Sequence, residues 1–580
     1  MLYSSKIFRL FIVLFIVYCL PLYLLAQKKS FTHADTLRGS ITPERAWWDV
    51  QRYDVKVTPD FLRKTITGEN QINYSVTRNN SNTPMQIDLQ QPLAIDSVRL
   101  NNTTSLPFAN EGNVWYLIMP PQKKGTSHTL QLFYSGKVHE AIRPPWDGGW
   151  IWAKDSLGRP WMTVACQGLG ASVWYPCKDH QSDEPDKGAS LTMTVPDTLT
   201  AIANGRIQFK KDNGNGTVTT KWAVVNAISN YCLIPYIGKY VNFSEVFNGE
   251  KGKLDVNYWV LDYNLESAKT YMPGQVHKML TAFEYWFGPY PFYEDGYQLI
   301  DASHSGMEHQ SAVSYGNGYK FGYRGRDPSG FGWGLKFDFI IIHESGHEWF
   351  GNNITTKDLA DMWVHEGFTN YSETLFTDYH FGKKAGNEYN FGIRKGIKNE
   401  MPVIPAYNVN AQGSGDMYPK AGNMLHAIRH SLDNDVLFRN ILRGLNKKFY
   451  HQTVTTQQVE KYISQQAGFN YSKVFDQYLR NTEIPVLEYY FSKDQHTFNY
   501  RYTHCIDGFN LPLALSNEQA KVRIAPSGKW QQYKVKAGES PLFEKGFIEE
   551  YYYINVKAVE QPAGQSGLLN SKSYVDNHTI

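Results

Sequence analysis

The stretch HESGHEWFGN (His343 to Asn352) directly follows a largely apolar run from Phe337 to Ile342. On a helix, residues four apart lie on one face, so His343 and His347 can offer their imidazoles to one metal ion while Glu344 lies beside it. A motif with three fixed residues, such as His-Glu-x-x-His, arises by chance in a chain of this length with a probability of roughly a few per cent. The motif therefore indicates a zinc hydrolase but leaves open that these are ordinary histidines on a helix surface.

A third candidate ligand lies further along the chain, in MWVHEGFTNYSE (362–373). Eighteen residues separate His347 from Glu366, which can approach from a second helix. Two histidines and one carboxylate leave one position of a tetrahedral zinc ion open, as in catalytic rather than structural zinc sites. We therefore expect one Zn²⁺ per chain, bound by His343, His347 and Glu366.

The zinc motif and its surroundings resemble the aminopeptidase N family of gluzincins. The resemblance includes the eighteen-residue spacing, WFGN behind the histidines and EGF at the third ligand. Further segments match in order: WYPCKDHQSDEPDKGASLTMTVP (174–196) followed by AIANG, FGPYPF (287–292), SGMEHQ (305–310) and YPKAGNMLHAIR (418–429). They resemble the family's Pro-Cys-x-Asp-Glu-Pro region, the approach to its exopeptidase motif, the motif Gly-x-Met-Glu-Asn itself and its Tyr-x-Lys-Gly segment. The resemblance covers about Arg52 to Asn481. The probability that so many ordered matches arise by chance is well below roughly one in a hundred.

The resemblance implies two catalytic residues, and their chemistry suits the roles. An ionised Glu344 only accepts hydrogen bonds, so it can take a proton from a zinc-activated water and deliver it to the leaving amine. Tyr418 matches the family's tyrosine, whose hydroxyl would stabilise the oxyanion of the tetrahedral intermediate. Ala421 replaces the glycine of that segment, and a packing role is the alternative for one tyrosine among 39.

An aminopeptidase also needs a fixed negative charge one residue away from the scissile bond, which pairs with the α-ammonium group of the substrate. The resemblance assigns this charge to Glu308 and places Gly306, Met307 and His309 with it in the substrate-binding motif. Gln167, in ACQGLGAS, resembles a family glutamine that also contacts the amine. The alternatives are a solvated loop carboxylate for Glu308 and a polar strand residue for Gln167.

Three positions depart from the family pattern without removing a ligand. Ser305 replaces the first glycine of the exopeptidase motif, His309 replaces its asparagine, and Glu348 replaces the usual glutamine after the second zinc histidine. We expect His309, protonated below about pH 6.5, to weaken the binding of a cationic N-terminus at acid pH. Glu373, about two turns beyond Glu366, resembles the carboxylate that orients a ligand histidine, and a solvated helix charge is the alternative.

The pattern of the chain predicts a multidomain α+β fold. Short alternating or β-branched runs, separated by turn residues, predict an N-terminal antiparallel β domain over 27–245. Apolar residues at helical spacing follow over 246–482, and the resemblance implies that this α-rich block is a thermolysin-like catalytic domain. Alternation returns over 483–580, which predicts a small C-terminal β domain with a loose polar tail. We expect the main helices at 276–287, 335–351, 364–381, 420–432 and 455–466.

The N-terminal segment, residues 1–26, has Lys6 and Arg9 ahead of an apolar run from Leu10 to Leu25. This pattern predicts a signal peptide and a secreted, periplasmic or cell-envelope protein, with no membrane span in the mature chain. An uncleaved membrane anchor is the alternative, although Pro21 interrupts a run that is barely long enough to span. Apart from Cys19 in this segment, the chain has four cysteines. They are too few for a disulfide scaffold, and the sequence allows one bridge without defining its pairing.

Composition argues against some functions and leaves one rival class. A formal net charge of +3 and the absence of long Lys/Arg blocks argue against a nucleic-acid partner. Aromatic residues make up 15% of the chain, which suits a β-rich protein and would also suit glycan binding. We expect a zinc-dependent aminopeptidase that acts on peptides with a free N-terminus, in an oligomeric state that the sequence does not define. A zinc endopeptidase and a catalytically degenerate peptide- or glycan-binding protein are the alternatives.

Overall fold

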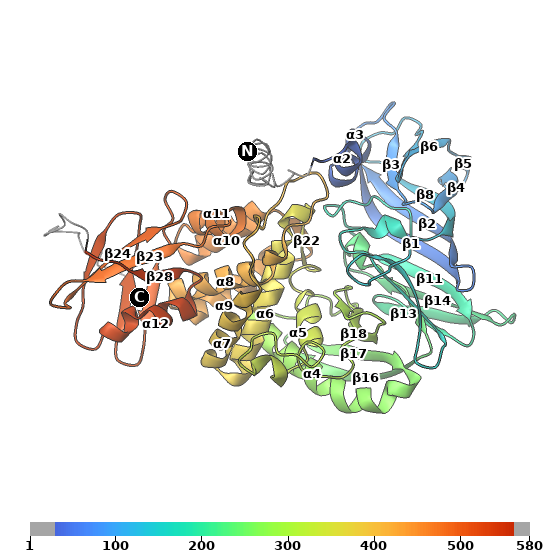
Figure 1. Cartoon of the computed structure of the whole chain (residues 1–580). Helices are drawn as coiled ribbons and strands as arrows, with labels where there is room; N and C mark the ends of the chain where they lie inside the picture. The colour runs from blue at the N-terminus through green and yellow to red at the C-terminus, as the bar shows by residue number, and fades with distance from the viewer. Residues whose placement is uncertain (1–29, 562–580) are drawn as a thin grey trace, which may run out of the picture.

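The computed structural model describes residues 30–561, so the signal peptide predicted for residues 1–26 lies outside the described part. Figure 1 shows three parts side by side. The β-rich N-terminal part (blue to teal) lies at one end, the helices of the predicted catalytic part (yellow) lie in the centre, and the small C-terminal part (orange to red) lies at the other end. The predicted multidomain α+β fold is confirmed.

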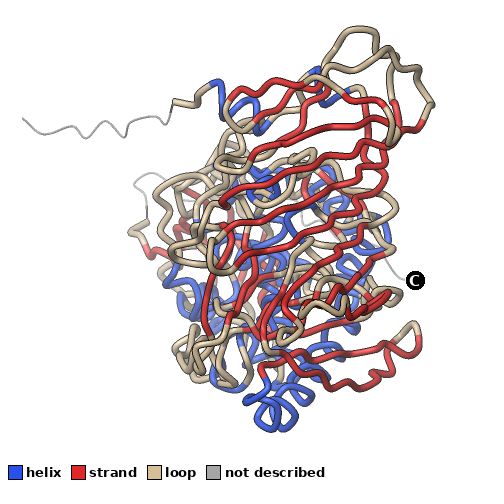
Figure 2. The backbone as a smooth tube through the Cα atoms, turned by 90° about the vertical axis from the view of Figure 1, so that its right-hand side faces the viewer, coloured by secondary structure: helices blue, strands red, loops and turns tan. Residues whose placement is uncertain are grey.

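The N-terminal part contains an eight-stranded sheet of order β13-β14-β11-β1-β2-β8-β4-β5, and Figure 2 shows its long strands side by side. In β14 (Thr217–Val224) every second residue is buried, which is the period-two pattern of a strand with one face on a core. The antiparallel prediction holds for every neighbouring pair except β1 and β11, which run parallel. The other strands are β1 (Trp48–Asp60), β2 (Thr65–Val76), β4 (Ala94–Leu100), β5 (Thr104–Ser105), β8 (Ser127–Lys137), β11 (Ala189–Pro196) and β13 (Arg206–Asp212).

Two smaller sheets and two short helices complete the N-terminal part. The sheets have the orders β12-β15-β10-β9 and β3-β7-β6. Trp48, Trp150 and Trp174 are among the largest fully buried side chains, and they belong to an apolar core that is separate from the core of the catalytic part. The elements are α2 (His33–Gly39), α3 (Pro43–Ala46), β3 (Met85–Asp88), β6 (Phe108–Glu111), β7 (Val114–Leu117), β9 (Gly149–Lys154), β10 (Pro160–Ala165), β12 (Thr200–Ile202) and β15 (Tyr236–Gly238).

The catalytic part begins with a five-stranded sheet of order β16-β17-β18-β20-β19. Its first strand, β16 (Tyr240–Gly249), crosses the domain boundary predicted at residues 245–246. The short strand β19 (Gly306–Met307), which carries the predicted exopeptidase motif, lies at the edge of the sheet beside β20 (Val313–Tyr315). Among the described strands, β19 pairs only with β20, so its outer side has no strand partner there. The other two strands are β17 (Gly252–Leu261) and β18 (Tyr297–Asp301).

Five helices of the catalytic part lie where periodicity predicts them, and three more were not predicted. The five are α4 (Leu265–Phe287), α5 (Phe339–Gly346), α6 (Trp363–Phe381), α8 (Pro419–Leu432) and α10 (Thr456–Ala467). Helix α5 is shorter than the predicted 335–351, because Asp338 caps its start and the regular helix ends at Gly346. The unpredicted helices are α7 (Lys383–Ile393), α9 (Asp435–Lys448) and α11 (Ser472–Arg480), and a strand pair joins β21 (Ile354–Thr356) to β22 (Gln452–Val454).

The C-terminal part is a small β domain that packs on helices α7 and α8 of the catalytic part. It contains a sheet of order β27-β24-β23-β28 and a two-stranded sheet, β25-β26. Its helix α12 (Lys545–Tyr551) contacts α7 and α8. The strands are β23 (Val486–Phe491), β24 (Thr497–Thr503), β25 (Leu513–Ser516), β26 (Lys521–Ile524), β27 (Gln531–Lys534) and β28 (Asn555–Ala558), and most of the predicted polar tail lies outside the described residues.

The cysteines of residues 30–561 are free thiols: Cys166, Cys177, Cys232 and Cys505. The one disulfide that the sequence allowed therefore does not form within this range. In the same range, no helix combines the length and the apolar character that a membrane crossing requires.

Candidate active site

Helix α5 and the residue that follows it present two histidines to one point. The side chain of Asp338 caps the helix by accepting a hydrogen bond from the backbone N–H of Ile341 at 3.2 Å. His343 lies in the last turn, and His347 is the first residue beyond Gly346. The backbone of His347 keeps helical angles (φ −63°, ψ −21°), so its ring lies one turn from that of His343, with centroids 5.1 Å apart.

Glu366, in the first turn of α6, completes a set of three possible metal ligands. Its Oε2 lies 3.3 Å from Nε2 of His347 and 3.8 Å from Nε2 of His343. Ligand atoms about 2.0–2.2 Å from a tetrahedral zinc ion are about 3.3–3.6 Å apart, so this spacing fits one ion. The same Oε2 is buried and accepts no hydrogen bond from the described residues. A buried carboxylate oxygen without a donor is costly, so the site fits a metal cation.

Hydrogen bonds at the other ring nitrogen orient both histidines. Nδ1 of His343 lies 2.7 Å from Oε1 of Glu373, and Nδ1 of His347 lies 3.0 Å from the carbonyl oxygen of Phe350. When each Nδ1–H donates outward, Nε2 remains free to bind a metal. Glu373 is fully buried, so the alternative of a solvated helix charge is wrong. Tyr389, on the unpredicted helix α7, donates to Oε2 of Glu373 at 2.6 Å, and no motif in the sequence marks it.

Glu344 lies beside the ligand set in a buried position. Burial raises the pKa of its carboxyl to about 7, although the nearby imidazole of His343 acts in the opposite direction. A carboxyl with a pKa near neutrality can both accept and return a proton. A Cβ at Gly306 would lie only 2.7 Å from Oε1 of Glu344. Gly306 therefore supports the site by leaving room for this carboxylate, whereas its own contribution to substrate binding is limited to the backbone.

Tyr418 lies at the start of α8, half-buried, with its ring stacked on the ring of His343. The two centroids are 6.0 Å apart and the planes differ by 27°. Burial, together with the charges of Glu366 and Glu308, raises the pKa of the Tyr418 hydroxyl well above 10. The hydroxyl is therefore a neutral donor near the metal ligands, as stabilisation of an oxyanion requires.

Gln167 and Glu308 are 141 positions apart in the sequence and meet at the site. Nε2 of Gln167 donates to Oε1 of Glu308 at 2.7 Å and to Oε1 of Glu366 at 3.1 Å. Glu308 is buried and Gln167 follows the end of β10, so a solvated loop carboxylate and a strand residue are both wrong as alternatives. Burial raises the pKa of Glu308. Glu308, Glu344 and His347 each place one ligand atom within 4.8 Å of the others.

His309 is fully buried, and its ring contacts protein groups. Its Nδ1 lies 2.6 Å from the hydroxyl of Tyr236 and 3.1 Å from that of Ser314. Burial holds the pKa of His309 well below 6.5. The prediction that it becomes charged near pH 6.5 and repels a cationic N-terminus is therefore wrong. Met307 belongs to a small apolar cluster with Ile151 of the N-terminal part.

Two further residues contact Glu308 and were not predicted. The hydroxyl of Tyr231 donates to Oε1 of Glu308 at 2.9 Å, and Nδ2 of Asn352 donates to the backbone carbonyl of Glu308 at 2.8 Å. Asn352 is the last residue of the WFGN segment, so its place behind the zinc histidines was a usable signal. Tyr231 lies in NYCLIP, which carries no motif.

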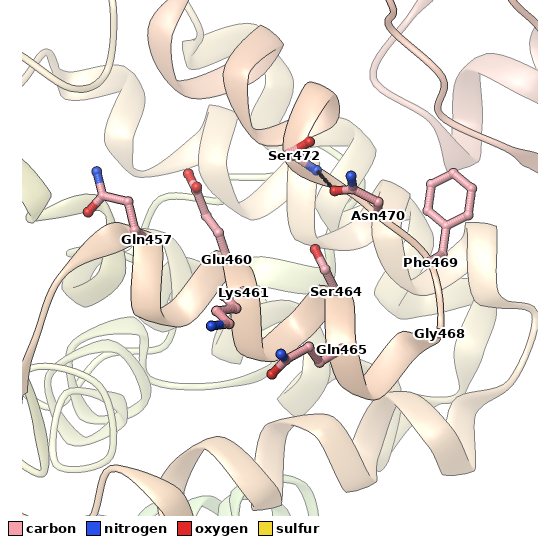
Figure 3. A pocket seen from close by; sticks show the side chains of 9 residues that line it. All are labelled: Gln457, Glu460, Lys461, Ser464, Gln465, Gly468, Phe469, Asn470 and Ser472. Carbon is pink, nitrogen blue, oxygen red and sulfur yellow. Dashed lines mark hydrogen bonds between the residues drawn. The ribbon is translucent and has the colours of Figure 1, made fainter.

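An open groove on α10 is distinct from this site. Glu460 is its one carboxylate, and Arg480 donates to that carboxylate at 2.8 Å. The groove contains no histidine or cysteine, so it offers neither a metal-ligand set nor a free acid. Figure 3 shows the residues that line it, most of which have polar side chains: Gln457, Glu460, Lys461, Ser464, Gln465, Gly468, Phe469, Asn470 and Ser472.

Two family models match the chain in order. The peptidase M1 N-terminal domain matches residues 50–232, and the peptidase family M1 domain matches residues 274–478. The second match contains the three candidate metal ligands, Glu344 and Glu308. The first match contains Gln167 and ends at residue 232, beside Tyr231.

Similar curated proteins include three whose names state an enzyme activity. Endoplasmic reticulum aminopeptidase 1 of Mus musculus is 23% identical over 370 residues, which are 60% of this chain and 38% of the relative. Leukotriene A-4 hydrolase of Xenopus laevis is 22% identical, with 54% of this chain and 51% of the relative covered. Aminopeptidase N of Rattus norvegicus is 22% identical, with 56% and 36% covered. The chain thus spans between about a third and a half of the length of these relatives.

Similar solved structures support the fold. The M1 zinc metallopeptidase from Deinococcus radiodurans aligns with a TM-score of 0.64 at 20% identity, over 77% of this chain and 95% of that chain. A mutant of that enzyme bound to a Tyr-Ser-Ala substrate aligns with a TM-score of 0.63 at 20% identity, over 75% of this chain and 95% of that chain.

Proposed function

Because the chain belongs to the peptidase M1 family, and because its site joins a three-ligand metal set to a buried carboxylate, we propose that it is a zinc-dependent aminopeptidase. One observation carries the proposal: ligand atoms of Glu308, Glu344 and His347 lie within 4.8 Å of one another. An α-ammonium group held at Glu308 therefore places the first peptide bond, and no later one, beside Glu344. The aminopeptidase names of the M1 relatives support the same function.

The catalytic residues have distinct tasks. Zinc bound by His343, His347 and Glu366 would polarise the scissile carbonyl and lower the pKa of a water molecule. Glu344 takes the proton of the attacking water and returns it to the leaving amine. The hydroxyl of Tyr418 donates a hydrogen bond to the oxyanion of the tetrahedral intermediate, where an extra donor is worth about 3 kcal/mol.

The substrate is held at its amine and along its backbone. Glu308 pairs with the α-ammonium group, and Gln167 fixes the Glu308 carboxylate relative to the metal ligand Glu366. The edge strand β19 leaves backbone groups that an extended peptide can pair with, as an added strand does. A peptide bound in this way has its N-terminus at Glu308 and its first peptide bond at Glu344.

Free and N-acetylated aminoacyl substrates separate an aminopeptidase from an endopeptidase. Acetylation removes the positive charge that pairs with Glu308 and adds bulk where the chain must end. We expect kcat/KM of the purified zinc enzyme to be at least about a hundredfold higher for the free-amine substrate. Equal cleavage of both forms would contradict the proposal and favour a zinc endopeptidase.

The wild-type protein tests the metal, and the variant Glu344→Gln tests the base. The wild-type protein should contain about one zinc per chain, lose activity to a chelator and regain it with added zinc. Glu344→Gln should keep the zinc, because Glu344 is not a ligand, and should lose turnover. Wild-type turnover by this variant would contradict the role of Glu344 as the base. Activity in a metal-free wild-type protein would contradict the role of zinc.

We also propose that the N-terminal segment exports the protein to a secreted, periplasmic or cell-envelope location. The basic residues Lys6 and Arg9 ahead of the apolar run from Leu10 to Leu25 support this proposal. N-terminal sequencing of the protein from its host cells should find a start near residue 27. A start at Met1 in the membrane fraction would instead support the uncleaved anchor.

A further inference from the structure

Two neutral donors converge on one oxygen of the amine-binding carboxylate. Nε2 of Gln167 donates to Oε1 of Glu308 at 2.7 Å, and the hydroxyl of Tyr231 donates to the same atom at 2.9 Å. Tyr231 is buried and comes from the N-terminal part, in the 3₁₀ turn Asn230–Cys232. Gln167 was assigned by its motif, whereas Tyr231 has no assigned role.

The turn that carries Tyr231 is fixed on both sides. The hydroxyl of Tyr175 donates to the carbonyl of Asn230 at 3.0 Å, and Nδ2 of Asn230 donates to the carbonyl of Lys178 at 2.8 Å. After the turn, Nδ2 of Asn204 donates to the carbonyl of Cys232 at 2.8 Å. A turn held by these bonds places the Tyr231 hydroxyl with little freedom, as positioning of a partner group requires.

The chemistry of the two donors suits recognition of a cation. A hydroxyl and an amide orient Glu308 without neutralising its negative charge, whereas a lysine or arginine at 2.9 Å would compete with the substrate amine. Both donors use Oε1, so Oε2 remains for the ammonium group. Burial raises the pKa of Tyr231 well above 10, so the phenol stays a neutral donor over the working pH range.

We infer that Tyr231 is a positioning residue for amine recognition: its hydroxyl holds the Glu308 carboxylate in the orientation that receives the α-ammonium group of the substrate. This inference rests on the proposed aminopeptidase function. Tyr231→Phe removes one hydrogen-bond donor and keeps the ring. The variant should therefore lose affinity for the amine while zinc content and the affinity of groups that contact only the metal stay unchanged.

A pair of inhibitors measures this effect directly. Leucine hydroxamate has a metal-binding group and a free amine, and 4-methylpentanoyl hydroxamate is the same molecule without the amine. On the zinc enzyme, Tyr231→Phe should raise Ki for leucine hydroxamate about tenfold and leave Ki for the des-amino compound within about twofold. Tyr74→Phe is the matched control, since it removes another buried hydroxyl of the N-terminal part, one bonded to Gln122. It should change neither Ki.

A double-mutant cycle separates positioning from a general loss of structure. In a Glu308→Gln background, Tyr231→Phe should have no further effect on leucine hydroxamate, because the group that it positions has lost its charge. Tyr231→His keeps a ring with an N–H donor and should retain part of the preference for the amine. If Tyr231→Phe folds poorly, Tyr231→His on zinc-loaded protein still decides the question, because the ratio of the two Ki values then measures the preference for the amine.

Each outcome has a definite meaning. Equal weakening of both hydroxamates by Tyr231→Phe, or no weakening of either, would overturn the role of Tyr231. A wild-type enzyme that binds both hydroxamates equally would instead overturn the amine site, and with it the aminopeptidase proposal. The two failures are therefore distinguishable in one experiment.

Discussion

Glu348 shows how burial sets the chemistry of one carboxyl. It is fully buried beside a zinc-ligand histidine, and burial raises its pKa to about 8. Its Oε1 accepts a hydrogen bond from the backbone N–H of Ser311 at 2.8 Å, and its Oε2 lies 3.0 Å from the hydroxyl of Tyr290. That hydroxyl also lies 3.2 Å from the carbonyl of Gly296 and has one hydrogen to donate. A protonated Glu348 can donate to Tyr290 while Tyr290 donates to Gly296, so the neutral acid satisfies all three groups.

Glu348→Gln should stabilise the protein at alkaline pH. The folded-state pKa of about 8 lies above the ordinary value of 4.5, so between these values the folded protein holds a proton that the unfolded chain has released. Wild-type stability therefore falls as pH rises through this window, by up to about 1.4 kcal/mol per pH unit. Glutamine does not titrate, and its side-chain N–H can replace the O–H donor of the protonated acid. We expect Tm of the variant to equal that of the wild type near pH 5 and to exceed it by several degrees near pH 8.5.

Two Tm results would contradict the protonation of buried Glu348. A Tm difference that is the same at both pH values would show that Glu348 does not change protonation in this window. A variant less stable than the wild type at pH 8.5 would show that the ionised carboxylate is the form that Ser311 and Tyr290 stabilise.

At the scale of elements, the apolar pattern does not mark a helix whose packing depends on close contact with its neighbours. Helix α7 reads KKAGNEYNFGI, and its two glycines lower helix propensity by about 1 kcal/mol each relative to alanine. The packing requires them: a Cβ at Gly386 would lie 2.8 Å from Cβ of Asp378 on α6, and a Cβ at Gly392 would meet the backbone of Ser329. The spacing of apolar residues along a helix does not determine how closely it packs on a neighbouring helix. Helix α7, and Tyr389 with it, could therefore not be predicted from the pattern.

Asp338 decides where helix α5 begins, and the zinc histidines are fixed relative to that start. Its carboxylate accepts hydrogen bonds from the N–H of Ile341 at 3.2 Å, the hydroxyl of Tyr315 at 2.8 Å and Nδ2 of Asn317 at 3.0 Å. Asp338→Ala removes the cap and leaves these buried donors without an acceptor. We expect the free energy of unfolding to fall by about 2–5 kcal/mol, and zinc to be released at lower chelator concentration.

The cap of α9 provides the matched control for this prediction. Asn434 caps that helix by accepting a hydrogen bond from the N–H of Leu437 at 2.9 Å, and α9 carries no residue of the site. Asn434→Ala should cost about 1 kcal/mol of stability, with no change in the chelator concentration that removes half of the zinc. Equal loss of zinc by both variants would mean that the start of α5 has no special effect on the metal site.

At the scale of the whole molecule, the sequence predicts what is local and not what depends on docking. His343 and His347 are one helical turn apart, so helix geometry alone brings them together. Gln167 meets Glu308 across 141 positions, and only the fold of two parts against each other makes that contact. Gln167 was found because a motif marks it, whereas Tyr231 makes the same contact without a motif and was missed. Long-range contacts carry no periodic signal.

Asn204 fixes the two parts to each other beside the amine site. It is buried after β12, in the N-terminal part, and its Nδ2 donates to the carbonyl of Cys232 at 2.8 Å and to the carbonyl of Gln310 at 2.7 Å. Cys232 follows Tyr231, and Gln310 lies two positions after Glu308 in the catalytic part. One amide group thus connects the segment of the donor to the segment of the carboxylate.

Asn204→Ala should therefore weaken amine recognition more than it weakens the chemistry. Without the amide, the two segments can separate, so we expect KM for a free-amine substrate to rise about five- to tenfold while kcat changes by less than about twofold. The loss of buried hydrogen bonds should also lower stability by about 1–3 kcal/mol.

Asn70→Ala is the matched control, since Nδ2 of Asn70 donates to the carbonyl of Pro176 at 2.8 Å entirely within the N-terminal part. It should lower stability to a similar extent and leave KM unchanged. If Asn70→Ala raised KM as much as Asn204→Ala, the KM effect would reflect general destabilisation, and the position of one part on the other would not control amine binding.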